Sequence, residues 1–345
     1  MKVVVDDKIP YIQAPLKELV DEVIALPGKK ISATDVKDAD ALIVRTRTRC
    51  NEDLLKGSRV RFIATATIGY DHIDEVYCKD HQIVWANAPG SNSSSVEQYV
   101  ESVFILLEKK GILLHGKTIG IVGGGNVGKK IISLADKYGL RVLLNDLPRE
   151  EVEDGRFYSL NELAETSDII TFHVPLYREG RFKTFHLGNH TFFNRLKRKP
   201  ILINTSRGEV LETEALLNAI SAGSVSEIIL DVWENEPNIN LELLHKTYIG
   251  TPHIAGYSAD GKANASQMAL DAFCEFFHLP SAYTILPPSP TNVYIQGDTE
   301  ADCLLDIYNP MQDNDKLKEN PSQFEFLRGN YPLRREKKAY TIELL

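Results

Sequence analysis

The sequence predicts an α/β protein with two parallel-sheet domains and a small C-terminal appendage. Three observations support this fold class. Short Val- and Ile-rich runs alternate with helical patterns, the alternation occurs in two series, and the pattern changes after residue 256. Strands that alternate with helices form parallel sheets with helices on both faces. The 345 residues suffice for two or three domains.

The first series of elements occupies the N-terminal third of the chain. Helical patterns lie between its strands at 15–25 and 51–56, and a longer helix is expected over 95–110, before Gly111. These elements predict one parallel sheet. The expected strands are 2–7, 41–46, 61–67 and 83–87.

The second series predicts another parallel sheet. Helical patterns at 127–138, 160–166 and 213–222 separate most of its strands. The expected strands are 117–122, 141–145, 168–174, 200–205, 226–231 and 248–251.

The C-terminal part of the chain differs from both series. A helix is expected over 261–278, and we expect it to pack back onto the first domain. A proline-rich segment, 286–290, has the composition of a stiff linker. The tail that follows is polar, with β-like pieces at 292–296 and 339–342. The predicted domains are a substrate domain (1–93 and 257–285), a nucleotide-binding domain (94–256) and an appendage (286–345).

Composition and charge exclude several classes of protein. The 39 basic and 48 acidic residues give a net charge of -9, which argues against a nucleic-acid binder and a basic membrane-surface protein. No apolar run reaches the roughly 18 residues of a membrane span. The N-terminus turns acidic at Asp6 and Asp7, unlike a signal peptide. We expect a cytoplasmic protein with free thiols. The cysteines are Cys50, Cys78, Cys274 and Cys303.

A glycine motif indicates a dinucleotide site. Gly123, Gly125 and Gly128 match GxGxxG, and the pattern lies between an expected strand and an expected helix. The first glycine permits a tight turn, the second a close approach to a pyrophosphate, and the third helix–strand packing. The helix N-terminus then presents its amides to the anion. This context predicts a Rossmann domain.

The acidic residue at the end of the next strand indicates which cofactor binds. Asp146 lies 18 residues after Gly128, close to where an acid accepts a hydrogen bond from a ribose 2′-hydroxyl. A carboxylate at this position repels a 2′-phosphate. The expected cofactor is therefore NAD rather than NADP.

Three further side chains follow strands of the same sheet. Arg207 follows the strand at 200–205, Glu236 comes five residues after Asp231, and His253 follows the strand at 248–251. The carboxyl ends of parallel strands meet at one edge, where ligands bind. An arginine fork suits a carboxylate, a histidine exchanges protons near neutral pH, and a nearby carboxylate orients the ring. Together they predict hydride transfer with acid–base assistance.

Three motifs resemble signatures of the D-isomer-specific 2-hydroxyacid dehydrogenases. They are the sequences INTSRG at 203–208, DVWENEP at 231–237 and TPHIAG at 251–256. With the glycine motif they occur in family order, and the resemblance runs from residue 2 to about residue 280. It implies a flavodoxin-like α/β substrate domain beside the Rossmann domain.

The resemblance also assigns roles to residues. In that family the arginine holds the substrate carboxylate and C2 oxygen, and the Glu–His pair moves the C2 hydroxyl proton. Arg207, Glu236 and His253 are therefore the expected catalytic residues, and Asp231 is expected on the nicotinamide side. Further cofactor contacts are expected at Asn126, Val127, Val174, Ser206 and Gly256.

Four segments resemble one branch of the family more closely. They are 2–11, 64–74, 253–258 and the tail segment 324–336, FEFLRGNYPLRRE. The tail is the most specific of these, because generic members of the family lack it. The resemblance implies NAD-dependent oxidation of a phosphorylated four-carbon D-2-hydroxy acid in vitamin B6 biosynthesis, by a homodimer built through the appendage. Val174 stands where this branch has a threonine.

Substrate contacts are expected in the first domain and beside His253. Arg207 and the backbone around Gly69 are expected to bind the carboxylate end. By resemblance, Thr46, Thr67 and Tyr257 supply hydroxyl contacts. Arg45, Arg47 and Arg49 share one face of an extended segment. Arg45 ends a strand and is the best candidate for a phosphate contact, the alternative being an exposed strand end.

Other functions compete with this interpretation. A phosphoglycerate or glycerate dehydrogenase would carry the same catalytic set, and transcriptional corepressors use the same scaffold to sense NAD. The complete set of Arg207, Glu236 and His253 favours an enzyme. His186 and His190 have a ligand-like spacing but lack a third ligand, so no metal is expected.

Overall fold

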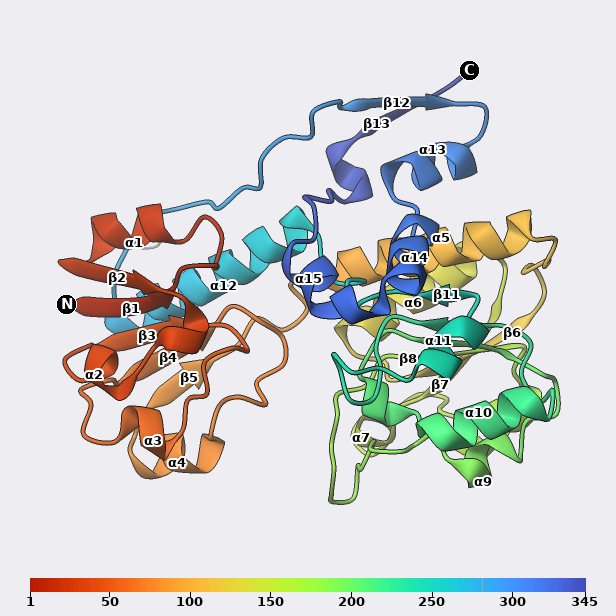
Figure 1. Cartoon of the computed structure of the whole chain (residues 1–345), viewed down its shortest axis with the longest axis horizontal. Helices are drawn as coiled ribbons and strands as arrows, with labels where there is room; N and C mark the ends of the chain where they lie inside the picture. The colour runs from red at the N-terminus through yellow and green to blue at the C-terminus, as the bar shows by residue number, and fades with distance from the viewer. Residues whose placement is uncertain (281) are drawn as a thin grey trace. The chain divides into compact units, whose positions relative to one another are not determined.

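The computed structural model describes residues 1–280 and 282–345, which form two compact units. Unit 1 comprises Met1–Asn92 and Ser258–Thr291, and unit 2 comprises Ser93–Tyr257 and Asn292–Leu345 (Figure 1). The C-terminal tail therefore groups with the nucleotide-binding region. Its separation as a third domain remains a prediction.

Unit 1 is built on a five-stranded parallel sheet in the order β2-β1-β3-β4-β5. This is the strand order of flavodoxin-like domains, as the resemblance implied. The strands are β1 (Lys2–Asp6), β2 (Glu22–Leu26), β3 (Ala41–Val44), β4 (Phe62–Thr65) and β5 (Val84–Ala86).

Both faces of this sheet are covered, which explains its continuous apolar strands. In β1, Val3 and Val5 pack with α1 (Gln13–Leu19) and α12 (Ala259–Phe277), whereas Val4 packs on the opposite face. The helices of that opposite face are α2 (Ala33–Val36), α3 (Glu52–Leu55) and α4 (Glu75–Asp80).

One predicted helix of unit 1 is wrong. The helical pattern at 15–25 ends at Leu19, and Glu22–Leu26 forms the edge strand β2. This segment pairs in parallel with β1 along its whole length. Pairing with a neighbouring strand overrides a local helical pattern in so short a segment.

The helix predicted to pack back onto the first domain does so. It begins at Ala259, because the Ser258 side chain caps its first turn by accepting from the Gly261 amide. Phe276 of α12 stacks on Phe62 of β4 with ring centroids 5.0 Å apart. A segment far along the chain thus completes the core of the N-terminal unit.

Unit 2 contains a six-stranded parallel sheet in the order β11-β10-β9-β8-β6-β7. The chain passes from β6 out to β7 and then returns to β8 on the other side of β6. Ligands of such sheets bind at this switch point, beyond the carboxyl ends of the strands. The strands are β6 (Thr118–Val122), β7 (Arg141–Asn145), β8 (Ile169–Phe172), β9 (Ile201–Asn204), β10 (Ile228–Leu230) and β11 (Ile249–Gly250).

Helices cover both faces of this sheet as well, in agreement with the predicted Rossmann architecture. The apolar side chains of α5 (Ser93–Lys109) and α6 (Asn126–Lys137) form one core with Ile119 and Ile121. Val122 belongs to the core on the other face. The helices of unit 2 that remain before the tail are α7 (Leu147–Glu150), α8 (Leu160–Thr166), α9 (His190–Phe193), α10 (Thr213–Ser221) and α11 (Leu241–Lys246).

The tail forms an α+β appendage on unit 2, as predicted. β12 (Tyr294–Gly297) and β13 (Thr341–Leu344) pair in parallel, and three helices lie between them in sequence (Figure 1). These helices are α13 (Glu300–Ile307), α14 (Met311–Glu319) and α15 (Phe324–Gly329).

The middle of the appendage is anchored at the edge of the nucleotide-binding sheet. The Asn314 side chain of α14 accepts a 2.9 Å hydrogen bond from the Gly250 amide of edge strand β11. Leu317 and Phe324 are buried in the core of unit 2. An edge amide that would otherwise lack a partner is thus satisfied. Over the described ranges, no helix combines the length and apolar character needed to cross a membrane.

We predict that Asn314→Ala loosens this anchor. The substitution leaves the buried Gly250 amide without its acceptor, at a cost of about 1–3 kcal/mol. Hydrogen exchange of the Gly250 amide should accelerate accordingly. Asn314→Asp keeps an acceptor oxygen and serves as the control. Unchanged Gly250 protection in Asn314→Ala would show that this bond does not hold α14 to the sheet.

Candidate active site

The glycine loop has the geometry of a dinucleotide-binding turn. Gly123 has a φ of +96°, and a Cβ there would lie 2.5 Å from the His173 carbonyl oxygen. A Cβ on Gly128 would collide with the Gly123 carbonyl. At Gly125, which precedes α6, a Cβ would meet no atom within 4 Å. The first and third glycines are thus required by the fold, whereas the second keeps open space before the helix N-terminus, where a pyrophosphate fits.

The side chain of Asp146 is held beside this loop. One of its oxygens accepts from the Gly124 amide at 2.7 Å, and the other accepts from the Arg149 amide at 3.2 Å. A carboxylate oxygen can accept a second bond. Asp146 therefore remains able to bind a ribose hydroxyl.

Arg149 lies beside the glycine loop, and the motif did not single it out. Its Nη1 donates to the Gly124 carbonyl at 2.8 Å, while Nε and Nη2 donate to both carboxylate oxygens of Glu153. An arginine near this position can bind the 2′-phosphate of NADP. Here its charge is balanced by Glu153, so the paired arginine favours NAD.

The end of β8 lies against the glycine loop. Val174 has a methyl group 2.8 Å from where a Gly123 Cβ would lie. The neighbouring His173 is partly buried, and its ring nitrogens lie 2.8 and 3.3 Å from the hydroxyls of Thr171 and Thr205. Desolvation of the ring lowers the pKa of His173 to about 3. This imidazole is therefore neutral near pH 7, which the sequence did not reveal.

Arg207 is presented by a tight turn after β9. Asn204 is 1% exposed, and its side chain accepts from the amide and hydroxyl of Ser206 and donates to the Arg207 carbonyl. The Arg207 guanidinium donates to the Ser206 carbonyl at 2.8 Å. It has no ion pair within the part of the chain that the structure describes. Its positive charge is therefore available to an anionic ligand.

The turn carrying Arg207 packs directly on the loop after β10. A Cβ on Gly208 would overlap the backbone of Trp233 and Glu234, so the two loops meet backbone to backbone. The Trp233 amide donates to Glu236 Oε1 at 3.0 Å. This close packing fixes Arg207 and Glu236 on neighbouring strand ends.

Glu236 and His253 form a hydrogen-bonded pair. Glu236 Oε2 lies 2.8 Å from His253 Nδ1, and the two side chains are 18% and 24% exposed. With a proton on Nδ1 for this bond, Nε2 carries the lone pair that can accept a substrate proton. The predicted acid–base pair thus has the required geometry.

The pKa of the Glu236 carboxyl lies below its usual value. Burial raises this pKa, but the charge and hydrogen bond of His253, the charge of Arg328 and the Trp233 amide together lower it further. Glu236 is therefore ionised throughout the neutral range. It can lose its charge only as the pH falls below the usual range for a glutamate.

Asp231 holds the loop that carries His253. Its carboxylate is 1% exposed and accepts from the amides of Ile254 and Ala255 at 2.7 and 2.9 Å and from the Thr251 hydroxyl at 2.6 Å. The sequence suggested a cofactor contact, which stays a prediction. The loop-holding role is a further function that the motif did not reveal.

The predicted substrate residues divide between the two units. Arg45, Thr46, Thr67 and Gly69 lie in unit 1, after the neighbouring strands β3 and β4, and Tyr257 lies in unit 2. The Thr67 hydroxyl donates to the Gly69 carbonyl at 2.9 Å. These positions leave the substrate assignments as predictions.

Arg45 has a partner that the sequence did not indicate. Its Nε and Nη2 donate to the two carboxylate oxygens of Asp6 at 3.1 and 3.2 Å. Asp6 is fully buried, whereas Arg45 is 32% exposed. Two of the arginine's nitrogens are therefore committed to Asp6, and the Nη1 donors remain for a ligand.

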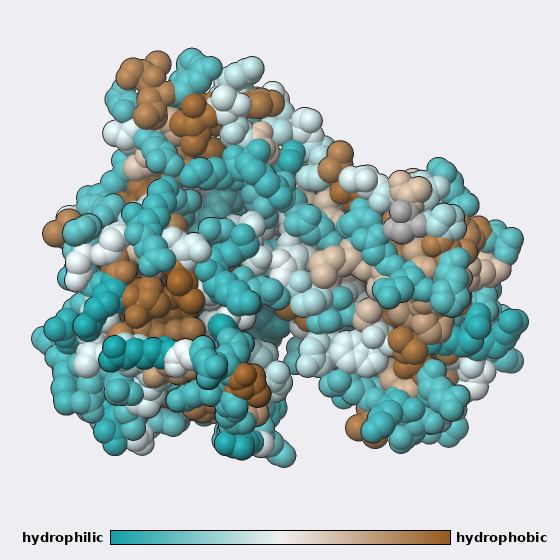
Figure 2. Space-filling view, turned by 180° about the vertical axis from the view of Figure 1, so that it is seen from behind, coloured by the Kyte–Doolittle hydropathy of each residue, from teal (hydrophilic) through white to brown (hydrophobic). Residues whose placement is uncertain are grey.

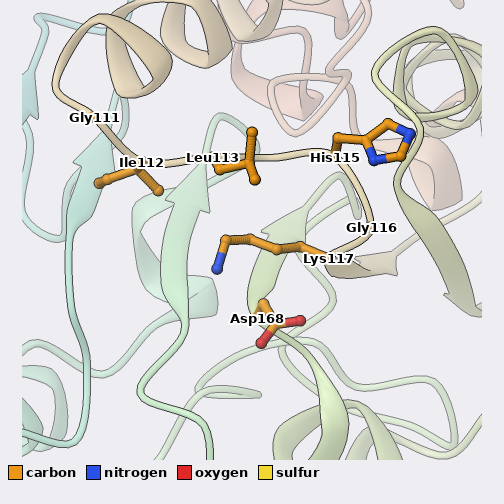
Figure 3. A pocket seen from close by; sticks show the side chains of 7 residues that line it. All are labelled: Gly111, Ile112, Leu113, His115, Gly116, Lys117 and Asp168. Atoms are coloured by element: carbon orange, nitrogen blue, oxygen red, sulfur yellow. The ribbon is translucent and has the colours of Figure 1, made fainter.

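The partners of His186 and the lining of one surface hollow are also defined. His186 bonds Glu234 at 2.7 Å, and within the described ranges no group of three or more metal-ligating side chains occurs. A surface hollow lies at the amino ends of β6 and β8, opposite the active-site edge (Figure 3), and its Asp168 already binds the Thr118 amide and Arg198. The hollow is lined by Gly111, Ile112, Leu113, His115, Gly116, Lys117 and Asp168.

Comparison with known proteins agrees with this geometry. The family described as D-isomer specific 2-hydroxyacid dehydrogenase, NAD binding domain, matches residues 92–255. The NAD-bound 3-phosphoglycerate dehydrogenase of Entamoeba histolytica is 26% identical, with a TM-score of 0.68 over 83% of this chain and 98% of that one. The chain belongs to the D-isomer specific 2-hydroxyacid dehydrogenase family. The predicted oxidoreductase class and NAD cofactor are thereby confirmed.

Relatives that match nearly the whole chain are more specific. The erythronate-4-phosphate dehydrogenase of Bacteroides thetaiotaomicron is 58% identical, covering 99% of both chains. The enzyme of the same name from Escherichia coli O157:H7 is 41% identical, covering 97% of this chain and 92% of its own. The similarity includes the C-terminal appendage, as the tail motif indicated.

We predict that Asp146→Ala weakens NAD binding and narrows its advantage over NADP. Loss of hydrogen bonds to a charged acceptor costs about 1.5–3 kcal/mol, or about 10- to 100-fold in affinity. Removal of the carboxylate also ends its repulsion of a 2′-phosphate. Adding Glu153→Gln should strengthen NADP binding further, because it releases Arg149. Titration of both cofactors, with the exposed Asp154→Ala as control, measures these effects. Equal use of both cofactors by the wild type would contradict the role of Asp146.

Proposed function

We propose that this protein oxidises 4-phospho-D-erythronate to 3-hydroxy-2-oxo-4-phosphooxybutanoate with NAD, as a step of pyridoxal 5′-phosphate biosynthesis. The Glu236–His253 bond at 2.8 Å supports the proposal, because this pair can accept the substrate proton. The choice of substrate is supported by a relative named erythronate-4-phosphate dehydrogenase, which is 58% identical over 99% of this chain. A cytoplasmic location is part of the proposal.

The geometry supports a proposed role for each of the three residues. Arg207, which has no acidic partner within the described ranges, binds the substrate carboxylate and holds the C2 oxygen. His253 accepts the C2 hydroxyl proton on Nε2, while Glu236 stabilises the resulting imidazolium. The open space at the Gly125 turn would hold NAD, which would supply the acceptor for the hydride from C2. The hydroxyl proton and the hydride leave together, so C2 becomes a ketone.

The protein is also proposed to act as a homodimer through the appendage. β12 and β13 form a two-stranded sheet that packs against α13, and so small a sheet gains stability from further packing. Hydrophobic side chains are visible at the top left of Figure 2, over the appendage. The exposed apolar residues of β12, β13 and their flanks are Val293, Tyr294, Leu344 and Leu345. A second copy covering this surface would stabilise the sheet.

A substrate panel tests the proposed activity. We expect NADH formation with 4-phosphoerythronate to exceed that with 3-phosphoglycerate, glycerate and erythronate. Arg207→Lys keeps the charge but loses the planar fork, so it should lower kcat strongly while the circular dichroism spectrum persists. Preference for another acid would favour a different hydroxyacid dehydrogenase. NADH binding without turnover would favour a corepressor-like protein.

We predict that Arg45 contributes to recognition of the phosphate. Arg45→Ala is a poor test, because it leaves the buried Asp6 without its partner, which destabilises by about 3–5 kcal/mol. The paired substitution Asp6→Asn with Arg45→Gln removes both charges. It should raise KM for 4-phosphoerythronate by about 10- to 100-fold and leave KM for erythronate nearly unchanged. Equal effects on the two acids would remove Arg45 from the phosphate site.

A further inference from the structure

Arg328 of the appendage lies beside Glu236 of the acid–base pair. Its Nη1 lies 3.6 Å from Glu236 Oε2, the oxygen that also contacts His253 Nδ1. The helix that carries it, α15, is fixed in unit 2 by Phe324, which is 1% exposed, and by Leu327. Arg328, Glu236 and His253 therefore belong to one compact unit.

This contact differs from the ion pairs on the protein surface. Arg328 and Glu236 are 22% and 18% exposed, whereas the side chains of the Lys56–Glu52 pair are 76% and 60% exposed. Exposed pairs contribute little because water screens them. A partly buried pair is screened less, so the Arg328 charge acts more strongly on Glu236.

Arg328 also has an unsatisfied donor. Its Nε is buried without a hydrogen-bond partner within the described part of the chain, and its guanidinium carbon lies 5.9 Å from the centroid of the Tyr257 ring. A buried donor without a partner costs free energy. The guanidinium therefore keeps a donor that is not committed to another protein group within the described residues.

We propose that Arg328 is a positioning residue that completes the charge chain His253–Glu236–Arg328, so that the appendage takes part in proton transfer. This inference rests on the proposed function. Glu236 Oε2 contacts both Arg328 and His253. Arg328, and His253 when it is protonated, stabilise the ionised carboxylate. The charge of Arg328 also opposes a second positive charge on His253, which must begin oxidation neutral.

The charged groups around the pair support this balance. Two residues face the Glu236 carboxylate, His253 on the loop after β11 and Arg328 on α15. Both lower the pKa of the Glu236 carboxyl, against the opposing effect of burial. His253 contacts Glu236, and its charge, when present, lowers the pKa of Asp231.

Charge-removing variants test the proposal. Arg328→Gln should raise the pKa of the Glu236 carboxyl. Carbon-13 NMR of the unliganded protein measures this titration, and the Glu236→Gln variant identifies the Glu236 signal. In the oxidation reaction, the acidic limb of the kcat/KM profile of Arg328→Gln should move to higher pH. At a pH on that limb, kcat/KM should fall about 3- to 10-fold. Arg328→Lys should retain most of the wild-type behaviour. Arg181→Gln removes the same charge at a 76% exposed site and should change neither measurement.

Several outcomes would overturn the proposal. A rise in KM with an unmoved acidic limb and unmoved Glu236 titration would make Arg328 a substrate contact. Equal effects of Arg328→Lys and Arg328→Gln would show that charge is not the cause. If Arg328→Gln does not fold, Arg328→Met, which keeps an apolar stem, replaces it. Absence of turnover in the wild type would reject the proposed function, while the Glu236 titration would still decide the role of Arg328.

Discussion

The catalytic edge of unit 2 depends on the buried carboxylate of Asp231. It accepts hydrogen bonds from three groups of the loop after β11, and the Asp231 backbone carbonyl accepts the His253 amide at 2.7 Å. His253 has a φ of +57°, a left-handed conformation that costs about 1–2 kcal/mol for a residue with a side chain. Burial raises the pKa of Asp231, so its ionised form depends on the donors it organises. The acid and the loop therefore stabilise each other.

Arginines near the expected anionic ligands follow a common arrangement. Arg45 is bound to Asp6, Arg149 to Glu153, and Arg328 lies beside Glu236. Each acid limits the net positive charge that its arginine offers. Arg207 is the exception, because within the described residues its guanidinium donates to a backbone carbonyl and pairs with no carboxylate. The full charge is thus presented where the substrate carboxylate is proposed to bind.

The sequence predicted the parts of the site that local motifs determine. The glycine turn, Asp146 and the strand-end positions of Arg207, Glu236 and His253 follow from short patterns whose backbone requirements are strict. The edge strand β2 was missed, because its pairing with β1, rather than its own residues, makes it a strand.

The partners of site residues were not predictable in the same way. The contacts Arg45–Asp6 and Arg328–Glu236 join residues far apart in the chain, and no spacing rule identifies such pairs. The position of His173 between the hydroxyls of Thr171 and Thr205 likewise depends on how β8 and β9 lie together. Long-range packing, rather than residue type, determines these features.

The discontinuous composition of unit 1 has a consequence for biosynthesis. Its five strands end at Ala86, but α12, which covers one face of their sheet, begins at Ala259. A nascent chain that emerges N-terminus first therefore leaves the face containing Val3, Val5 and Phe62 without α12 until the whole sheet of unit 2 has been translated. During that interval this apolar face lacks the helix that covers it in the folded protein. The nucleotide-binding sheet, encoded by continuous sequence, can complete its core first.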